Sequence, residues 1–123
     1  MEYSPATARY FAALARAGEL PKGVPGLVSG EAEDRTLQVW IRFELQIGGG
    51  VVRLARFEAF GCPHTLAAAS RVAEWLEGRS ESEAHTLDVK GLCADLEVPV
   101  EKLGKLLRIE DAVAVCWRSR GPQ

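Results

Sequence analysis

The sequence predicts an α+β fold, in which a small antiparallel sheet packs against helices grouped on one side. Three observations support this expectation. Apolar and polar residues alternate over residues 37–47, three consecutive glycines separate that stretch from a second strand-like stretch at 51–60, and from residue 63 onward the apolar residues recur with helical spacing. Strands followed by a run of helices are typical of this fold class.

The first part of the chain is expected to hold one helix and one loop. Residues 5 to about 17 predict a helix, because Pro5 suits the first helical position and an apolar face follows it. Gly and Pro are frequent over residues 18–30, which predicts a loop with room for a short strand at Leu27-Val28.

The strongest local pattern lies in residues 37–47. Every odd position there is apolar and the even positions are polar except Trp40, as in a strand with one buried face. The three glycines that follow can form a tight turn into an antiparallel strand at 51–60. Arg53 and Arg56 blur the alternation of this second strand, so its inner face is less clear.

The remainder of the chain is expected to be helical. Its helix boundaries are marked by residues that start, cap or stop helices, namely Pro63, Gly78, Ser80, Glu83, Asp88 and Pro99. They predict one long helix, two short ones and a last helix from about Val100 to Cys116. No repeat or linker interrupts the pattern, so residues 1–123 are expected to form a single domain.

Composition and charge argue against several classes of function. Hydrophobic residues make up 47% and charged residues 26% of the chain, as in an ordinary soluble globular protein. The 15 basic and 17 acidic residues give a net charge of −2, so nucleic-acid binding is not predicted. Apolar runs are too short to span a membrane and the N-terminus lacks a signal-peptide pattern, so a reducing cytoplasm is the expected location.

The three cysteines are odd in number and widely spaced, which does not predict a disulfide framework. Cys93 and Cys116 each continue an apolar helical stripe and are expected to be core residues. Cys62 lies between Gly61 and Pro63, where a strand ends and a helix begins. Unpaired N–H groups and the helix dipole favour a thiolate there, so Cys62 is the candidate functional residue. The alternative is a small residue that fills a tight turn.

Enzyme chemistry at Cys62 has weaker support. His64 stands two residues away, but side chains two apart on a helix diverge and no third orienting group is evident. His85 lies in a polar segment and is expected to be solvated. Zinc-site spacings such as C-x-x-C are absent from the sequence. We therefore expect a protein that is not an enzyme, with a thiol enzyme as the less favoured alternative.

A longer motif surrounds Cys62 in residues 55–84. It comprises Ala55-Arg56-Phe57, Phe60-Gly61-Cys62, the small residues from Ala67 to Ser70, Glu74-Trp75, Gly78, Ser80 and Glu83-Ala84. This stretch resembles the central motif of the NifU-like (IscU-type) iron–sulfur cluster assembly scaffolds, and a fainter likeness extends over nearly the whole chain. The resemblance implies an α+β fold with a three-stranded antiparallel sheet and helices packed on one face.

For function, the resemblance implies assembly of a 2Fe–2S cluster. In that family a cysteine desulfurase supplies sulfur as a persulfide, iron joins it, and the cluster passes to acceptor proteins. Cys62 occupies the middle of three cysteine positions that ligate the cluster. The implied cofactor is therefore a 2Fe–2S cluster or iron, and the implied partners are a cysteine desulfurase and other iron–sulfur assembly proteins.

The other two ligand positions depart from the family pattern. Ungapped counting puts Glu33 at the first cysteine and Arg35 at a nearby aspartate, and a one-residue slip would offer Asp34 as the acid. Gly104 and Lys105 stand where the family has a His-Cys pair. Lys105 thus marks a degenerate ligand position, and we expect that it could pair with one of the two acids.

Two mechanisms stay open on this pattern. In the first, Cys62 holds iron or a labile 2Fe–2S cluster, with Glu33 and Asp34 as candidate metal ligands and with help from a second subunit of a homodimer or an external thiol. In the second, the chain is an interaction or regulatory module that has lost stable cluster binding. Ligand chemistry favours the second, because iron in such clusters prefers sulfur. Persulfide acceptance by Cys62 remains open in both.

Overall fold

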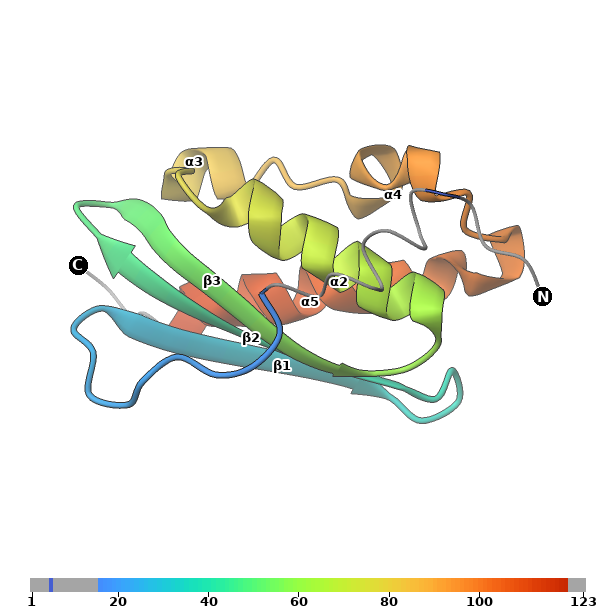
Figure 1. Ribbon diagram of the computed structural model, residues 1–123, viewed down its shortest axis with the longest axis horizontal. Coiled ribbons are helices and arrows are strands. Elements are labelled where there is room, and N and C mark those ends of the chain that lie inside the picture. The colour runs from blue at the N-terminus through green and yellow to red at the C-terminus, as the bar shows by residue number, and fades with distance from the viewer. Residues whose placement is uncertain (1–4, 6–15, 120–123) are drawn as a thin grey trace.

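The computed structural model describes residues 5 and 16–119 (Figure 1). Most of the helix expected at 5–17 lies outside these residues. At its expected end, Ala17 instead forms a parallel β-bridge with Phe57, so the prediction of a helix reaching Ala17 was wrong. The N–H of Gly18 donates to the Phe57 carbonyl at 2.8 Å, which directs the backbone to the sheet rather than to a helical turn.

Three antiparallel strands form the sheet, in the order β1 (Leu27–Asp34), β2 (Val39–Gly48) and β3 (Val51–Phe60). The expected three-stranded antiparallel sheet is confirmed. β1 is longer than the short strand expected at Leu27-Val28, since all of its residues pair with β2. Its glycine and acidic residues disfavour a strand by propensity alone, so the pairing partner extends it.

The central strand β2 confirms the alternation seen in the sequence. Its inward positions are buried, namely Val39, Ile41, Phe43, Leu45 and Ile47. Gly49 and Gly50, with φ of +62° and +76°, form the turn into β3. The pairing register shifts between Gln46 and Ile47, which leaves Arg53 between two paired residues of β3. This β-bulge explains why the alternation of β3 is blurred.

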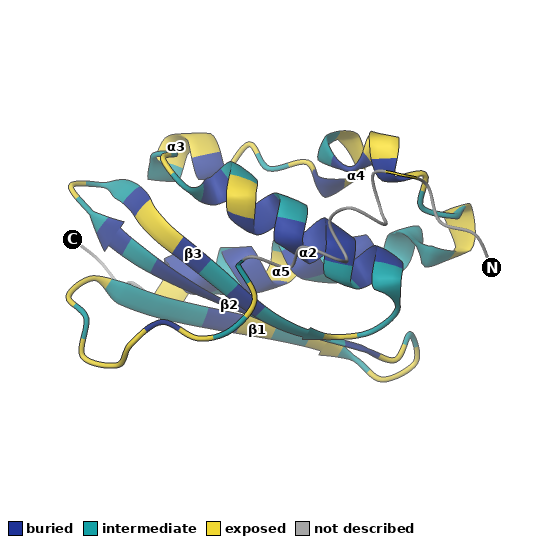
Figure 2. Cartoon of the chain, viewed as in Figure 1, coloured by how far each residue is buried: buried dark blue, intermediate teal, exposed yellow. Residues whose placement is uncertain are grey.

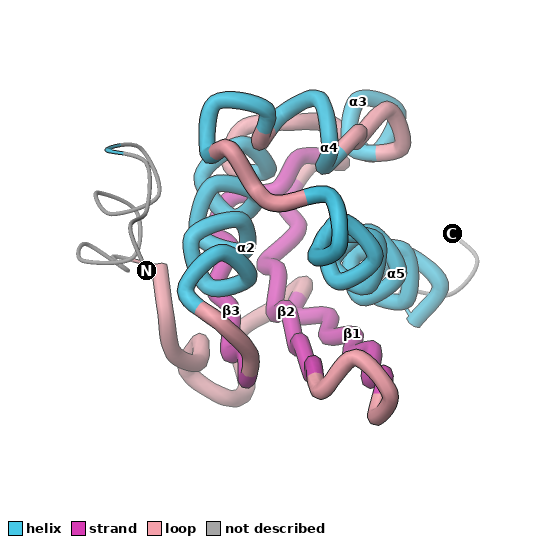
Figure 3. The backbone as a smooth tube through the Cα atoms, turned by 90° about the vertical axis from the view of Figure 1, so that its right-hand side faces the viewer, coloured by secondary structure: helices cyan, strands magenta, loops and turns pink. Residues whose placement is uncertain are grey.

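The helices follow the sheet in sequence. They are α2 (Pro63–Leu76), α3 (Glu81–Ala84), α4 (Val89–Leu92), the 3₁₀ helices η1 (Ala94–Leu96) and η2 (Val100–Lys102), and α5 (Leu103–Ser119). α2 packs on β3, and α5 packs on β1 and β2. Both long helices therefore cover one face of the sheet (Figure 1, Figure 3).

Two predicted helix caps have different outcomes. Ser80 and Glu83 form a complete capping box, with hydrogen bonds of 3.2 Å to the Ser80 hydroxyl and 3.0 Å to the Glu83 carboxylate. Asp88 occupies the N-cap of α4, but its side chain makes no capping hydrogen bond. Glu110 supplies the acceptor instead, because its Oε2 receives the Val89 N–H at 2.9 Å.

The core lies between the sheet and the two long helices (Figure 2). The inner stripe of α2 is made of small residues, among them Ala67, Ala68, Ala69 and Ala73, which let the helix lie close to β3. Gly30 lets β1 lie close to α5, because a Cβ at this position would collide with the Ala112 carbonyl of that helix. Within the described part of the chain, none of the helices has the length and apolar character needed to cross a membrane.

Candidate functional site

Three segments that are distant in sequence meet at one end of the sheet (Figure 1). β1 ends at Asp34 and β2 begins at Val39, while β3 ends at Phe60, two residues before Cys62. The first turn of α5 reaches the same end, since a Cβ on Gly104 would lie 3.4 Å from a side chain of the β1–β2 turn. The fold thus gathers the three places at which the family resemblance implies ligands.

Cys62 is the N-cap residue of α2 and is half-buried. Its Sγ lies 3.5 Å from the Thr65 Oγ1. Burial raises the pKa of the thiol, but hydrogen bonds from the Thr65 hydroxyl and backbone N–H, with the charges of Lys105 and Lys102, hold the pKa below its ordinary value of 9.0. Gly61 keeps this arrangement possible, because a Cβ there would press on the Thr65 side chain at 3.2 Å.

His64 is buried and interacts with a lysine. Its Nδ1 lies 3.4 Å from the Lys102 Nζ, so this ring nitrogen accepts a hydrogen bond from the ammonium group. Burial and the charges of Lys102 and Lys105 lower the pKa of His64. A neutral ring of low basicity beside two cations is a poor proton acceptor, which weakens the thiol-enzyme alternative. His85 is exposed, as its polar segment predicted.

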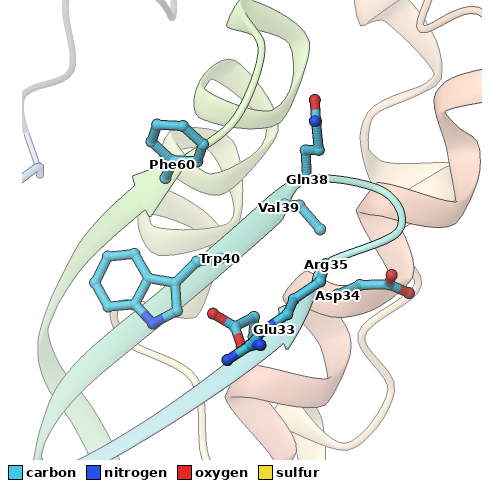
Figure 4. Close-up of a pocket in the computed structure, with 7 residues that line it drawn as sticks. All are labelled: Glu33, Asp34, Arg35, Gln38, Val39, Trp40 and Phe60. Carbon is cyan, nitrogen blue, oxygen red and sulfur yellow. The ribbon is translucent and has the colours of Figure 1, made fainter.

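The acidic candidates of β1 are paired with arginines. Asp34 Oδ1 accepts a backbone N–H of the β1–β2 turn at 3.1 Å, and its Oδ2 lies 3.9 Å from the Arg108 Nη1. Glu33 Oε1 lies 3.3 Å from the Arg35 Nε. The expectation that Lys105 pairs with one of these acids was wrong, because the two arginines take that place. Figure 4 shows Asp34 directed toward α5, while Glu33 and Arg35 lie side by side.

The other two cysteines are core residues, as predicted. Cys93 is 2% and Cys116 0% exposed, and burial raises the pKa of each thiol to about 12. The Cys116 thiol donates to the Phe43 carbonyl at 3.5 Å, well inside the sheet–helix interface. Cys62 is therefore the accessible cysteine of the three. Over residues 16–119, no three side chains of His, Cys, Asp or Glu come together closely enough to hold a metal ion.

A groove of about 340 Å³ opens at the same end of the sheet (Figure 4). It is lined by Glu33, Asp34, Arg35, Gln38, Val39, Trp40 and Phe60. The cross-strand neighbours Trp40 and Phe60 supply large apolar surface, and Phe60 is 69% exposed. The Trp40 Nε1–H donates to the Glu31 Oε2 at 2.7 Å, which orients the indole. This groove depends on the β1–β2 turn lying beside the end of β3, so no local sequence pattern predicted it.

Sequence reasoning missed three residues that shape the site, namely Thr65, Lys102 and Arg108. Thr65 had a local signal, because it stands three residues after Cys62 on a helix and such side chains meet. Lys102 and Arg108 had none, since each comes from a segment about forty or more residues along the chain and reaches the site only through the packing of α5.

These features define a class of protein, an α+β protein whose three-stranded antiparallel sheet leads into a helix that begins at a half-buried cysteine of lowered pKa. The family follows from the sequence. The family model for the NifU-like N terminal domain matches residues 15–117, so this chain belongs to that family.

Curated relatives and a solved structure extend the comparison. The iron-sulfur cluster assembly scaffold protein IscU of Escherichia coli K12 is 34% identical over 64 residues, which cover 52% of this chain and 50% of that protein. The chain thus spans about half the length of that relative. IscU of Azotobacter vinelandii is 28% identical over 93 residues, or 76% of this chain and 70% of the relative.

The solved structure shows likeness of fold. The N-terminal part of a nitrogen-fixing NifU-like protein from Brucella abortus superposes with a TM-score of 0.76 and covers 94% of this chain and 92% of that one. Its sequence is 18% identical, so the likeness concerns the fold alone. It agrees with the α+β architecture expected from the sequence.

Proposed function

We propose that this protein acts in iron–sulfur cluster assembly as a scaffold-type protein, not as an enzyme, and that Cys62 is the residue through which it acts. Membership of the NifU-like family supports the process, and the IscU relatives are named as scaffolds of cluster assembly. The observation that carries the choice of residue is the thiol of Cys62, half-buried at the start of α2 with its pKa lowered. Thiolates are the groups that accept sulfur and hold iron.

The partner proposed for the first step is a cysteine desulfurase that carries a persulfide. The Cys62 thiolate attacks the terminal sulfur of that persulfide, a new S–S bond forms on Cys62, and the old S–S bond breaks. The desulfurase cysteine leaves as a thiolate, so sulfur and electrons balance without a further oxidant or reductant. Other iron–sulfur assembly proteins are the proposed donors of iron and acceptors of the cluster.

The proposed cargo is iron or a 2Fe–2S cluster, with Cys62 as its first ligand. Asp34 and Glu33 are secondary candidates, because each would first have to leave its arginine. A second copy of the chain or an external thiol would supply the remaining ligands. The alternative on the same fold is an interaction module without a cluster, which the groove at Trp40 and Phe60 favours because its exposed aromatic surface suits a protein partner.

Sulfur transfer to Cys62 is the direct test of the proposed function. The protein is incubated with a cysteine desulfurase and cysteine, and the peptide that contains Cys62 is analysed by mass spectrometry. We expect the added mass of one sulfur atom on this peptide, no addition in Cys62→Ser, and an unchanged result in Cys93→Ala. Transfer that is absent, or equal in Cys62→Ser, would refute the proposal.

Anaerobic reconstitution with iron and sulfide separates the scaffold from the interaction module. The scaffold predicts charge-transfer absorption that disappears in Cys62→Ser. The interaction module predicts that both the wild-type protein and Cys62→Ser stay colourless.

A further inference from the structure

One face of the sheet is open at the end where β3 stops. Both long helices lie on the other face (Figure 3), and the segment before β1 covers the open face farther along, where the Leu20 N–H donates to the Glu44 Oε1 at 2.8 Å. Trp40 and Phe60 are cross-strand neighbours beyond this crossing, and Phe60 is 69% exposed. Two adjoining aromatic side chains in an open groove form the kind of apolar surface that marks an interaction site.

The indole of Trp40 is held in place from the edge strand. Its Nε1–H donates to the Glu31 Oε2 at 2.7 Å, and Glu31 lies on β1, two residues before the residue that pairs with Trp40. Figure 4 shows the rings of Trp40 and Phe60 on the same side of the groove, one from β2 and one from the end of β3. A ring that is already oriented loses less conformational entropy when a partner binds to it.

The charges beside the two rings favour a cation. The two cross-strand rows at this end of the sheet hold three carboxylates and one guanidinium, and they are Glu33–Trp40–Phe60 and Glu31–Arg42–Glu58. The Arg42 guanidinium is divided between two of its neighbours, since it lies 3.5 Å from Glu58 and 3.1 Å from Glu44. Negative charge therefore exceeds positive charge around the aromatic pair.

Glu31 is the carboxylate most available to a cation from outside. Among the residues that the structure describes, no lysine or arginine pairs with it, and its hydrogen-bond donor is the uncharged indole. Glu33 lies 3.3 Å from Arg35, but the two side chains are 54% and 91% exposed, and an ion pair in water holds its partners weakly. A second cation can therefore approach both acids.

An arginine side chain fits this combination of groups. A planar guanidinium stacks on aromatic rings and can donate two hydrogen bonds to one carboxylate, whereas the ammonium of lysine is more strongly hydrated and does neither as well. A second copy of the chain fits less well, because it would bring two acidic faces together.

We propose that the face formed by Trp40, Phe60 and Glu31 docks a basic segment of a partner protein, with an arginine side chain stacked on the aromatic pair and bound to the Glu31 carboxylate. Because Phe60 stands two residues before Cys62, a partner docked here lies beside that cysteine. The inference goes beyond the proposed function, because it holds whether or not Cys62 carries sulfur.

The experiment is an NMR titration of the full-length protein with the peptide acetyl-Ala-Arg-Ala-amide. The indole N–H signal of Trp40, identified by its loss in Trp40→Phe, reports binding at this face. Matched peptides carry citrulline, lysine or glutamate in place of arginine, and citrulline keeps the shape of arginine without its charge. We expect the arginine peptide to bind about tenfold more tightly than the citrulline peptide, the lysine peptide to lie between, and the glutamate peptide not to bind.

Variants of the protein test the two halves of the face, with backbone amide signals of β2 as the readout. Trp40→Ala should weaken binding of the arginine peptide by about tenfold or more, because the stacking surface is lost. Glu31→Gln should weaken it by roughly three- to tenfold, because the amide keeps an acceptor for the indole and removes the charge. Glu74→Gln removes an equal charge from an exposed position of α2 and should bind like the wild type. Circular dichroism establishes that each variant is folded.

Several results would overturn the inference. They are equal affinity for the arginine and citrulline peptides, and equal losses in Glu31→Gln and Glu74→Gln. Raising the ionic strength should weaken the arginine peptide more than the citrulline peptide, and the opposite order would also count against it. Free arginine that binds as tightly as the peptide would assign the face to a small molecule. A dimer that depends on Trp40 in analytical ultracentrifugation would assign it to a second copy of the chain.

The outcomes also separate this inference from the proposed function. If Cys62 accepts no sulfur from a desulfurase while the arginine peptide binds through Trp40 and Glu31, the proposed function fails and the docking face stands. If Cys62 accepts sulfur while the arginine and citrulline peptides bind alike, the docking face is refuted and the proposed function stands.

Discussion

Cys62 and Cys116 show how position gives one side chain two opposite properties. Cys116 lies on the inner face of α5 at 0% exposure, where burial raises the pKa of its thiol to about 12. Cys62 lies at the start of α2, where Thr65 and two lysines outweigh burial and lower its pKa. A hydrogen-bond donor and nearby cations, and not the cysteine itself, therefore decide whether the pKa of a thiol in this fold is lowered or raised.

The largest expected difference between Cys62 and Cys116 is in the stability lost when each is replaced by aspartate. Cys116→Asp buries a carboxylate against the Phe43 carbonyl, and we expect the free energy of unfolding to fall by about 4 kcal/mol or more. Cys62→Asp should change it by less than about 1 kcal/mol, because aspartate is a good N-cap residue and the lysines are close. Urea denaturation measures both, and equal losses would contradict the comparison.

Reactivity toward iodoacetamide should distinguish the thiols in the folded protein. Cys62 should be alkylated first, while Cys93 and Cys116, whose pKa values are raised to about 12, should react only after unfolding. Because the folded pKa of Cys62 lies below 9.0, its rate should persist below that pH and fall as pH drops through the lowered pKa. The stability that its thiolate contributes should follow the same course, present above 9.0 and lost on acidification.

Peptide mapping of alkylated protein across a pH series gives these rates. Protein unfolded in urea is the control, because there the three thiols should react alike. Alkylation of Cys93 or Cys116 as fast as Cys62 in the folded protein would show that burial does not protect them.

The smallest expected effect is on the alkylation rate of Cys62 when the hydroxyl donor of Thr65 is removed. Thr65→Val keeps the shape of a fully buried side chain but deletes the hydroxyl 3.5 Å from the Cys62 Sγ. We expect the pKa of Cys62 to rise and alkylation near neutral pH to slow by roughly two- to tenfold, as the loss of one hydrogen bond implies. Thr65→Ser retains the donor and is the matched control. An unchanged rate in Thr65→Val would assign the lowered pKa of Cys62 to the backbone N–H of residue 65 and the lysines rather than to the hydroxyl.

Much of the fold could be predicted from short-range patterns. Alternation identified β2, the run of three glycines identified the turn into β3, and apolar residues at helical spacing identified α2. β1 could not be read in full, because its glycine and acidic residues become a strand only by pairing with β2 and by fitting under α5. Asp88 occupies the N-cap of α4 as predicted, but its side chain makes no capping hydrogen bond, because the distant Glu110 supplies the acceptor.

In the candidate site, too, some features follow from the local sequence and others from packing. The sequence by itself determined that Cys62 ends a strand and begins a helix, and that Cys93 and Cys116 continue apolar stripes, because both conclusions depend on neighbours within a few residues. The charged side chains near Cys62 and Asp34 became known from the tertiary structure. The charges of Lys102 and Lys105 act on the pKa of Cys62, and Arg108 pairs with Asp34, because the chain at α5 lies over the end of the sheet. Charge acts through space, so the lysine contribution to the pKa of Cys62 depends on packing, whereas the hydrogen bonds from Thr65 come from the local sequence.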